Sequence, residues 1–166
     1  MRDLLEKIYC SHRQGLFSLA LSITGCRQLA EDAIQSAFER LCRSSTAPAG
    51  DVVNYVFAAV RNAARDSVRS KQRASDVRET IFNGFVSADG TSREPVDGML
   101  TTERDQILRS AVDDLDEAER EVVVLKTFAG LTFAAIGEVL EQSEKTVATR
   151  YRRALLKLEE KLRGQL

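Results

Sequence analysis

The chain has 166 residues, of which 43% are hydrophobic and 30% are charged, and its formal net charge is −1. No apolar run approaches the roughly 18 residues of a membrane span, so the composition argues against membrane insertion and favours a cytoplasmic globular protein. The length allows one ordinary domain or two small ones. With only two prolines and nine glycines, helix is the default expectation.

Little in the sequence suggests catalysis. It has one histidine, no nucleotide-binding glycine loop and no cluster with metal-ligand spacing, so we expect no enzymatic activity, no cofactor and no metal site. Cys10, Cys26 and Cys42 form no CxxC pair, and we interpret them as reduced, mostly buried thiols.

Three helices are predicted in the first domain, residues 1–74. Apolar residues recur at helical spacing up to Gly25, again between Ala30 and Leu41, and a third time after Asp51, which can cap the third helix. Beyond this domain the periodicity disappears over residues 75–102, where glycine, proline and polar residues dominate. We expect this segment to be a flexible linker.

A second all-helical domain is predicted over residues 103–166. Its segment 131–153, LTFAAIGEVLEQSEKTVATRYRR, has the pattern of a helix-turn-helix: a short helix, a tight break and a basic helix. Thr132 and Ser143 can cap the two helices. The predicted contact between the two helices joins Ile136, Val139 and Leu140 to Val147 and Tyr151.

The last helix is expected to present a free, basic face. With Val147, Tyr151 and Leu155 turned inward, polar and basic side chains lie on the outer side and near the helix start, the part of a helix-turn-helix that enters the major groove. A solvated face on a plain helical hairpin is the alternative. The predicted DNA-contacting residues are Ser143, Lys145, Thr146, Thr149, Arg150 and Arg153.

The third helix carries four arginines at intervals of four residues, Arg61, Arg65, Arg69 and Arg73. Like charges at this spacing repel by a few tenths of a kcal/mol per pair, so an external polyanion explains the stripe better than helix stability does. The alternative is a solvated face that Asp66 and other acids neutralise.

The near-zero net charge conceals two basic elements. Residues 51–73 carry five basic groups against two acidic ones, and residues 143–163 carry seven against three. Acids outnumber bases in the predicted linker between them. A phosphate backbone responds to local charge, so a nucleic-acid partner remains compatible with the composition.

Taken in order, these segments resemble the extracytoplasmic-function sigma factors, small bacterial transcription initiation factors, over nearly the whole chain apart from the linker. Residues 29–41, LAEDAIQSAFERL, are similar to the family signature AED-xx-Q-xx-F. The resemblance implies that this helix docks on the clamp of the largest RNA polymerase subunit, with Phe38 in the core. The implied polymerase-binding residues are Glu31, Asp32, Gln35 and Glu39.

The same resemblance implies two promoter-reading elements. The third helix is similar to the family's minus-ten reader through Asn62, Asp66 and Arg69, and with the loop at residues 43–51 it would hold an unstacked base of the non-template strand. The C-terminal domain resembles the minus-thirty-five reader through a threonine-valine pair at Thr146 and an arginine-alanine pair at Arg153. The implied minus-ten residues are Arg61, Asn62, Arg65, Asp66, Arg69 and Arg73.

The sequence departs from the family pattern at three positions. Leu140-Glu141 replaces the usual leucine-glycine turn, so we expect a looser or differently capped turn. Ala148 stands where lysine or arginine often follows the threonine-valine pair, and Tyr55 stands where tryptophan is common. These departures bear on the promoter sequence that is read.

The resemblance implies core RNA polymerase and promoter DNA as partners, and an anti-sigma protein as a further family expectation. One alternative is a stand-alone helix-turn-helix regulator that binds duplex DNA without polymerase, which leaves the AED-xx-Q-xx-F helix unexplained. A second is a helical adaptor that binds polymerase without reading DNA.

Overall fold

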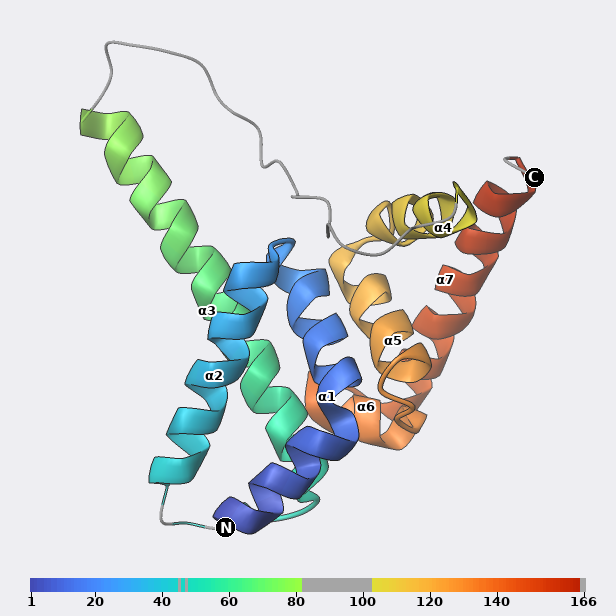
Figure 1. Ribbon diagram of the computed structural model, residues 1–166. Helices are drawn as coiled ribbons and strands as arrows, with labels where there is room; N and C mark the ends of the chain where they lie inside the picture. Colours follow the sequence, from blue (N-terminus) through green and yellow to red (C-terminus); the bar gives the residue numbers. More distant parts are fainter. Residues whose placement is uncertain (45, 47, 82–102, 165–166) are drawn as a thin grey trace.

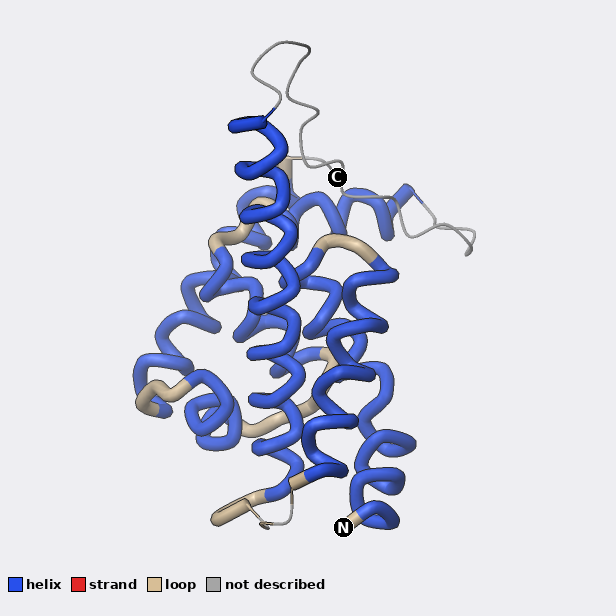
Figure 2. Tube along the Cα trace, turned by 90° about the vertical axis from the view of Figure 1, so that its left-hand side faces the viewer, coloured by secondary structure: helices blue, strands red, loops and turns tan. Residues whose placement is uncertain are grey.

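The computed structural model describes residues 1–44, 46, 48–81 and 103–164, and for residues 76–81 and 105 it describes the backbone alone. Every regular element in these ranges is a helix (Figure 2), which confirms the predicted all-α class. The elements are α1 (Arg2–Thr24), α2 (Arg27–Arg43), α3 (Val52–Ile81), α4 (Glu103–Asp113), α5 (Glu117–Thr127), α6 (Phe133–Leu140) and α7 (Glu144–Arg163). None of the described helices is long and apolar enough to cross a membrane.

Local chemistry explains where α1 ends and where α3 begins. Gly25 ends α1 in the left-handed conformation, with a φ of 65°, which glycine adopts without steric cost. Before α3, a carboxylate oxygen of Asp51 accepts hydrogen bonds from the backbone N–H groups of Val53 at 2.7 Å and Asn54 at 3.4 Å. The predicted cap of the third helix is therefore confirmed.

Helix α3 is longer than the sequence pattern indicated. It continues to Ile81, so its last turns occupy the beginning of the segment that we expected to be linker. Figure 1 shows this end of α3 extending beyond the other helices. The rest of the expected linker, residues 82–102, lies outside the described residues.

The helix-turn-helix is confirmed, and each of its predicted caps is present. The Thr132 hydroxyl accepts a hydrogen bond from the Ala135 N–H, and the Ser143 hydroxyl accepts one from the Thr146 N–H, both at 3.1 Å. The contact between α6 and α7 is also as predicted. Ile136, Val139, Leu140 and Val147 are buried, and Tyr151 packs against them.

Both halves of the chain contribute to one hydrophobic core. Helix α5 lies against α1, and α6 lies against α3 (Figure 1). The consecutive residues Val122, Val123, Val124 and Leu125 of α5 are all buried. Three of them join the core of α1, α2 and α3, while Val123 belongs to a smaller cluster with α4 and α7. This part of α5 is thus enclosed on both sides, which explains why four consecutive residues in it are apolar.

Two sequence interpretations are wrong in detail. Leu155 is 43% exposed, and Ala154 takes its place in the cluster that α7 forms with α4 and α5. The buried stripe of α7 therefore steps by three residues after Tyr151, because the two neighbouring helices lie toward that side. The cysteines are free, as expected, but Cys10 and Cys42 are exposed and Cys26 is half-buried. Apolar character alone did not decide their burial.

Candidate nucleic-acid interface

The outer face of α7 presents the polar and basic residues that the sequence singled out. Lys145, Thr146, Thr149 and Arg153 are exposed, opposite the fully buried Val147 and Ala154. Ser143 is exposed as well, but its hydroxyl caps the helix and lies 2.7 Å from the Thr146 hydroxyl. The cap fixes the start of the helix, and the exposed residues are free to contact a ligand.

Arg150 is held more firmly than its neighbours. It is half-buried, and its guanidinium donates a hydrogen bond to the side-chain carbonyl of Gln142 in the turn before α7. Of the two arginines among the predicted DNA-contacting residues, Arg153 is therefore the more exposed one. Arg152 is also exposed, and sequence reasoning did not select it.

The turn between α6 and α7 is tight although glycine is missing at its centre. Glu141 adopts the left-handed conformation with a φ of 55°, and the Gln142 N–H donates to the Gly137 carbonyl at 2.8 Å. Of the two expected alternatives, a looser turn is therefore wrong, whereas the cap does differ from the family pattern, because Glu141 holds the left-handed position instead of glycine. Gly137 makes the close turn possible, because a Cβ at this position would lie 2.6 Å from the Gln142 carbonyl oxygen. A glycine inside the short apolar helix was the sequence signal, and we had not used it.

The arginine stripe of α3 divides into two pairs. Successive residues at an interval of four are rotated by about 40° around a helix axis, so the stripe turns gradually away from its starting face. Arg69 and Arg73 are exposed, on the side that also carries the exposed Asn62 and Asp66. Arg61 and Arg65 turn toward α5.

Acidic residues of α5 pair with Arg61 and Arg65. The Nε of Arg61 lies 3.0 and 3.2 Å from the two carboxylate oxygens of Glu121, and an Nη of Arg65 lies 2.8 Å from a carboxylate oxygen of Glu117. Burial raises the pKa of Glu121 above its usual value, and the charge of Arg61 opposes this rise. Asp66, which we considered as the neutralising acid, is 4.0 Å from Arg40 of α2 instead.

The exposed side of α2 carries the predicted polymerase-binding residues. Glu31, Asp32, Gln35 and Glu39 are all exposed, while Ala33 and Ala37 face the core. Within this face the Gln35 amide donates to a Glu39 oxygen at 3.1 Å. Phe38 is half-buried, and its ring packs edge-on against Tyr9 of α1, 5.4 Å between centroids.

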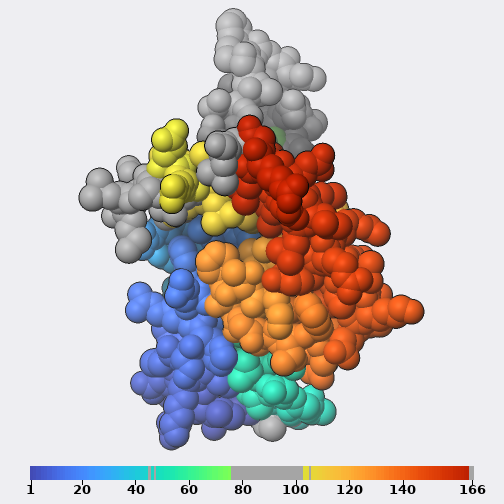
Figure 3. All heavy atoms as spheres, turned by 90° about the vertical axis from the view of Figure 1, so that its right-hand side faces the viewer, coloured from blue at the N-terminus to red at the C-terminus, as the bar shows by residue number. Residues whose placement is uncertain are grey.

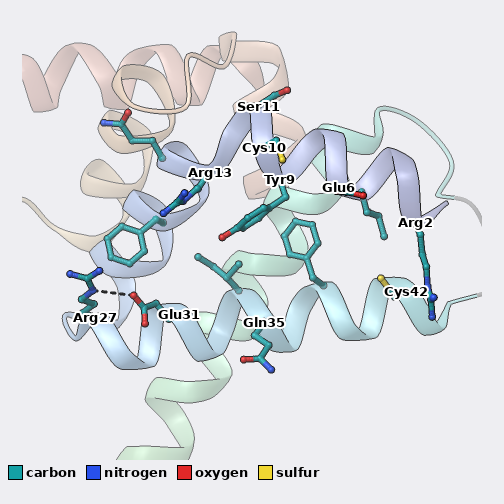
Figure 4. A pocket seen from close by; sticks show the side chains of 15 residues that line it. Arg2, Glu6, Tyr9, Cys10, Ser11, Arg13, Arg27, Glu31, Gln35 and Cys42 are labelled. Carbon is teal, nitrogen blue, oxygen red and sulfur yellow. Dashed lines mark hydrogen bonds and ion pairs between the residues drawn. The ribbon is translucent and has the colours of Figure 1, made fainter.

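A groove of about 980 Å³ runs between α1 and α2 beside this face. Figure 4 shows Tyr9 directed from α1 toward α2, the Arg27–Glu31 ion pair at one end, and Arg2 and Cys42 at the other. Its apolar floor and charged rim are suited to a helical segment of a partner. Among the described residues, no group of three or more histidine, cysteine, aspartate or glutamate side chains could hold a metal ion.

Two family models match the chain, and they correspond to its two helical parts. The model described as Sigma-70 region 2 covers residues 8–74, which form α1, α2 and most of α3. The model described as Sigma-70, region 4 covers residues 105–158, from α4 into α7.

Two curated relatives come from mycobacteria. The chain is 24% identical over 147 residues to the ECF RNA polymerase sigma factor SigK of Mycolicibacterium vanbaalenii, covering 87% of this chain and 74% of that protein. It is 26% identical over 163 residues to the probable ECF RNA polymerase sigma factor SigI of Mycobacterium tuberculosis, covering 95% of this chain and 55% of that protein.

Two solved structures share the fold over nearly the full length. The sigma factor RpoE of Bartonella quintana, solved with the anti-sigma factor NepR, superposes with a TM-score of 0.68 at 19% identity and 98% coverage of both chains. CnrH, solved with the cytosolic domain of CnrY, superposes with a TM-score of 0.67 at 21% identity, covering 100% of this chain and 92% of that one.

The two matched regions, in this order on an all-helical fold, define a promoter-recognition factor of bacterial RNA polymerase. The chain belongs to the sigma-70 family, as a sigma factor of the extracytoplasmic-function group. Its function is to direct RNA polymerase to promoters.

Proposed function

We propose that three separate surfaces divide the work of this sigma factor. The exposed face of α2 binds core polymerase, the exposed face of α3 reads the minus-ten element, and the outer face of α7 reads the minus-thirty-five element. The observation that carries the proposal is that each face is polar or charged on its exposed side and apolar where its helix joins the shared core. Each helix can therefore present these side chains without losing its packing.

The minus-thirty-five surface is built as a major-groove reader. Its capped helix start places Lys145, Thr146 and Thr149 at the end that enters a groove, where threonine and lysine contact phosphates. Arg153 is exposed and able to form the bidentate contact to guanine that arginine geometry favours. Arg150, held by Gln142, positions the turn and adds positive charge.

The minus-ten surface combines a polar pair with basic side chains. Asn62 and Asp66 are one helical turn apart and exposed, so an amide and a carboxylate can meet the edge of an unstacked base. Arg69 and Arg73 continue along the same face and can hold the backbone of the strand. Holding a flipped base costs a few kcal/mol, which such contacts must offset.

We further propose an anti-sigma protein as a partner, because the two solved relatives named above are complexes with NepR and with the cytosolic domain of CnrY. The groove between α1 and α2 and the exposed Leu155 and Leu156 of α7 are the apolar surfaces that such a partner could cover. The chain acts in the cytoplasm, where polymerase is, and performs no catalysis of its own.

Reconstituted transcription tests the proposed function. Purified core polymerase is combined with the chain on a library of fragments from the native genome, and transcript starts are mapped. We expect a limited set of start sites that core polymerase alone does not produce. The absence of specific starts on every fragment would contradict the proposal. A stand-alone regulator would bind some fragments but would start no transcripts with core enzyme.

A further inference from the structure

We infer that Arg152 of α7 is a specificity-determining residue, which reads the edge of a guanine in the minus-thirty-five element. This inference rests on the proposed role of α7 as the minus-thirty-five reader. It deepens that role, because it assigns one base contact to a side chain that the sequence pattern did not single out and names the kind of base that this side chain selects.

The buried side of α7 defines the direction in which the helix faces. Val147, Ala154 and Leu158 are its buried residues, and at about 100° per residue they lie within about 20° of one line along the helix. The helices that α7 contacts are α4, α5 and α6. Figure 3 shows the atoms of α7, from orange-red to red, at the surface of the molecule. The side opposite the buried line is therefore the side that a DNA duplex can approach.

Arg152 lies near the middle of this outward side. It is exposed, and its Cα direction is about 40° from the line opposite the buried residues, compared with about 60° for Arg153 and about 120° for Arg150. Lys145 and Thr149 are each about 20° from the same line. The most outward stripe of polar residues thus steps by four and three residues and ends in an arginine.

The cations of α7 divide into a paired set and an unpaired set. Every cation from residue 157 onwards forms an ion pair with an acid of the chain: these are Lys157, Lys161 and Arg163. The cations of α7 with no ion-pair or hydrogen-bond partner in the described part of the chain are Lys145, Arg152 and Arg153. These three span about 12 Å of helix, comparable to the width of the major groove. The unneutralised charge therefore lies at the end of α7 that enters the groove.

The turn before Arg152 leaves room for its side chain. Long side chains on a helix extend over the turn that precedes their own Cα, which carries Arg152 over Ala148 and Thr149. Ala148 is short and uncharged, so it neither blocks the guanidinium nor repels it. Arg153 extends over Thr149 and Arg150 instead, and Arg150 has the same charge. Arg152 therefore reaches toward the start of the helix with its N–H donors free.

A position in the middle of the outward side favours a base edge over a phosphate. A recognition helix in the major groove turns this part toward the floor of the groove, where the base edges lie, and its flanks toward the two backbones. A guanidinium there can donate two parallel hydrogen bonds to O6 and N7 of one guanine. No other side chain combines this reach with a matching pair of donors as closely as arginine does.

The experiment measures the base preferences of the reconstituted holoenzyme. One promoter from the mapped transcript starts is randomised over its upstream element, and the pool is sequenced before and after binding to core polymerase carrying each variant of the chain. The variants are Arg152→Ala and Arg152→Lys, which keeps the charge but lacks the planar fork. The control is Arg163→Ala, because Arg163 is exposed on the same helix but pairs with Glu159.

The wild-type holoenzyme should prefer a guanine at one position of the upstream element. Arg152→Ala should reduce this preference about tenfold and leave the preferences at the other positions in place. Arg152→Lys should lose the preference to a similar extent, because an ammonium group does not form the bidentate pair. Arg163→Ala should keep the wild-type profile, and all variants should keep wild-type affinity for core polymerase, since the replaced side chains lie at the surface.

A contact with phosphate alone would give a different result. Arg152→Ala would then weaken binding to every member of the pool equally, the slope of log K against log salt on a single promoter would fall by about 0.9, and lysine would restore binding. That result would overturn the inference, and so would an unchanged profile in Arg152→Ala. The wild-type profile separates this inference from the proposed function. A wild-type holoenzyme without any base preference in the upstream element would remove the proposed minus-thirty-five role itself, whereas a preference that survives in Arg152→Ala would remove only the role of Arg152.

Discussion

At the scale of single residues, the helix-turn-helix combines a strained position with a tight one. Glu141 adopts a left-handed backbone conformation, which costs a non-glycine residue roughly 1–2 kcal/mol. Four residues earlier, Gly137 lacks a Cβ where the Gln142 carbonyl approaches to 2.6 Å of the position that a Cβ would occupy. The turn that orients α7 therefore depends on the glycine at position 137. It forms although position 141, which is left-handed, holds glutamate instead of glycine.

Glu141→Gly should stabilise the protein by about 1 kcal/mol, because glycine adopts the left-handed conformation without a steric penalty. Urea unfolding measures the change. Gly137→Ala is the converse variant, and it should destabilise the protein although alanine is the better helix former. If both variants shifted the unfolding midpoint in the same direction, this description of the turn would be incorrect.

The buried carboxylate Glu121 should give stability a defined dependence on pH. Because burial raises its pKa above 4.5, the folded chain binds this proton more tightly than the unfolded chain does. The contribution is fully present below the unfolded pKa and is lost as the pH rises through the folded pKa. The free energy of unfolding of the wild type minus that of Glu121→Gln should therefore fall as the pH is raised from about 4.5. A difference that increases with pH would mean that Arg61 lowers this pKa more than burial raises it.

At the scale of elements, the sequence predicted individual helices better than their surroundings. The caps at Asp51, Thr132 and Ser143 are correct because each depends on two or three neighbouring residues. The predicted end of α3 and the predicted inward position of Leu155 were wrong, because both depend on which face a neighbouring helix covers. The same limit applies to the arginine stripe of α3, whose regular spacing does not reveal that its first two members meet α5.

The proposed role of α7 in reading the minus-thirty-five element yields a prediction about how the surfaces divide the work. Arg153→Ala should weaken binding to a minus-thirty-five duplex by about 1–3 kcal/mol, as expected for a lost base contact, and should leave affinity for core polymerase unchanged. Electrophoretic or anisotropy assays with promoter fragments measure the first quantity. Arg163→Ala is the control, since Arg163 is also exposed on α7 but pairs with Glu159 near the end of the helix.

An equal loss of core affinity in Arg153→Ala would contradict the separation of surfaces. Arg150→Ala should have a mixed effect, because this side chain also holds Gln142 in the turn before α7. Its loss therefore combines a structural and a binding contribution.

At the scale of the whole molecule, the chain is two family regions on one hydrophobic core. The run of Val122, Val123, Val124 and Leu125 has no polar face, and a helical turn of this kind needs cover on every side. This was the available signal that the second region packs on the first, yet the sequence could not say which surface would cover it. The class, the order of the two regions and the exposed polar faces of α2, α3 and α7 followed from local patterns and resemblance. The contact between the two regions follows only from the packing.

Leu125→Ala tests the shared core. Leu125 is fully buried in the cluster that includes α1, α2 and α3, so its truncation should cost about 2–5 kcal/mol. Hydrogen exchange should show faster amide exchange in α1 and α3 as well as in α5. Loss of protection confined to α4, α5, α6 and α7 would show that the regions fold independently.

Affinity for purified bacterial core RNA polymerase tests the central claim most directly. A fluorescent label on one of the exposed cysteines would disturb the groove, so the chain is labelled at its N-terminus and titrated with core enzyme. The account predicts saturable binding of the wild-type chain. The affinity should fall when Asp32 and Gln35 are both replaced by alanine, and it should be unchanged in the control variant Glu160→Ala. No affinity of the wild-type chain for core polymerase would contradict the account, whatever its affinity for DNA.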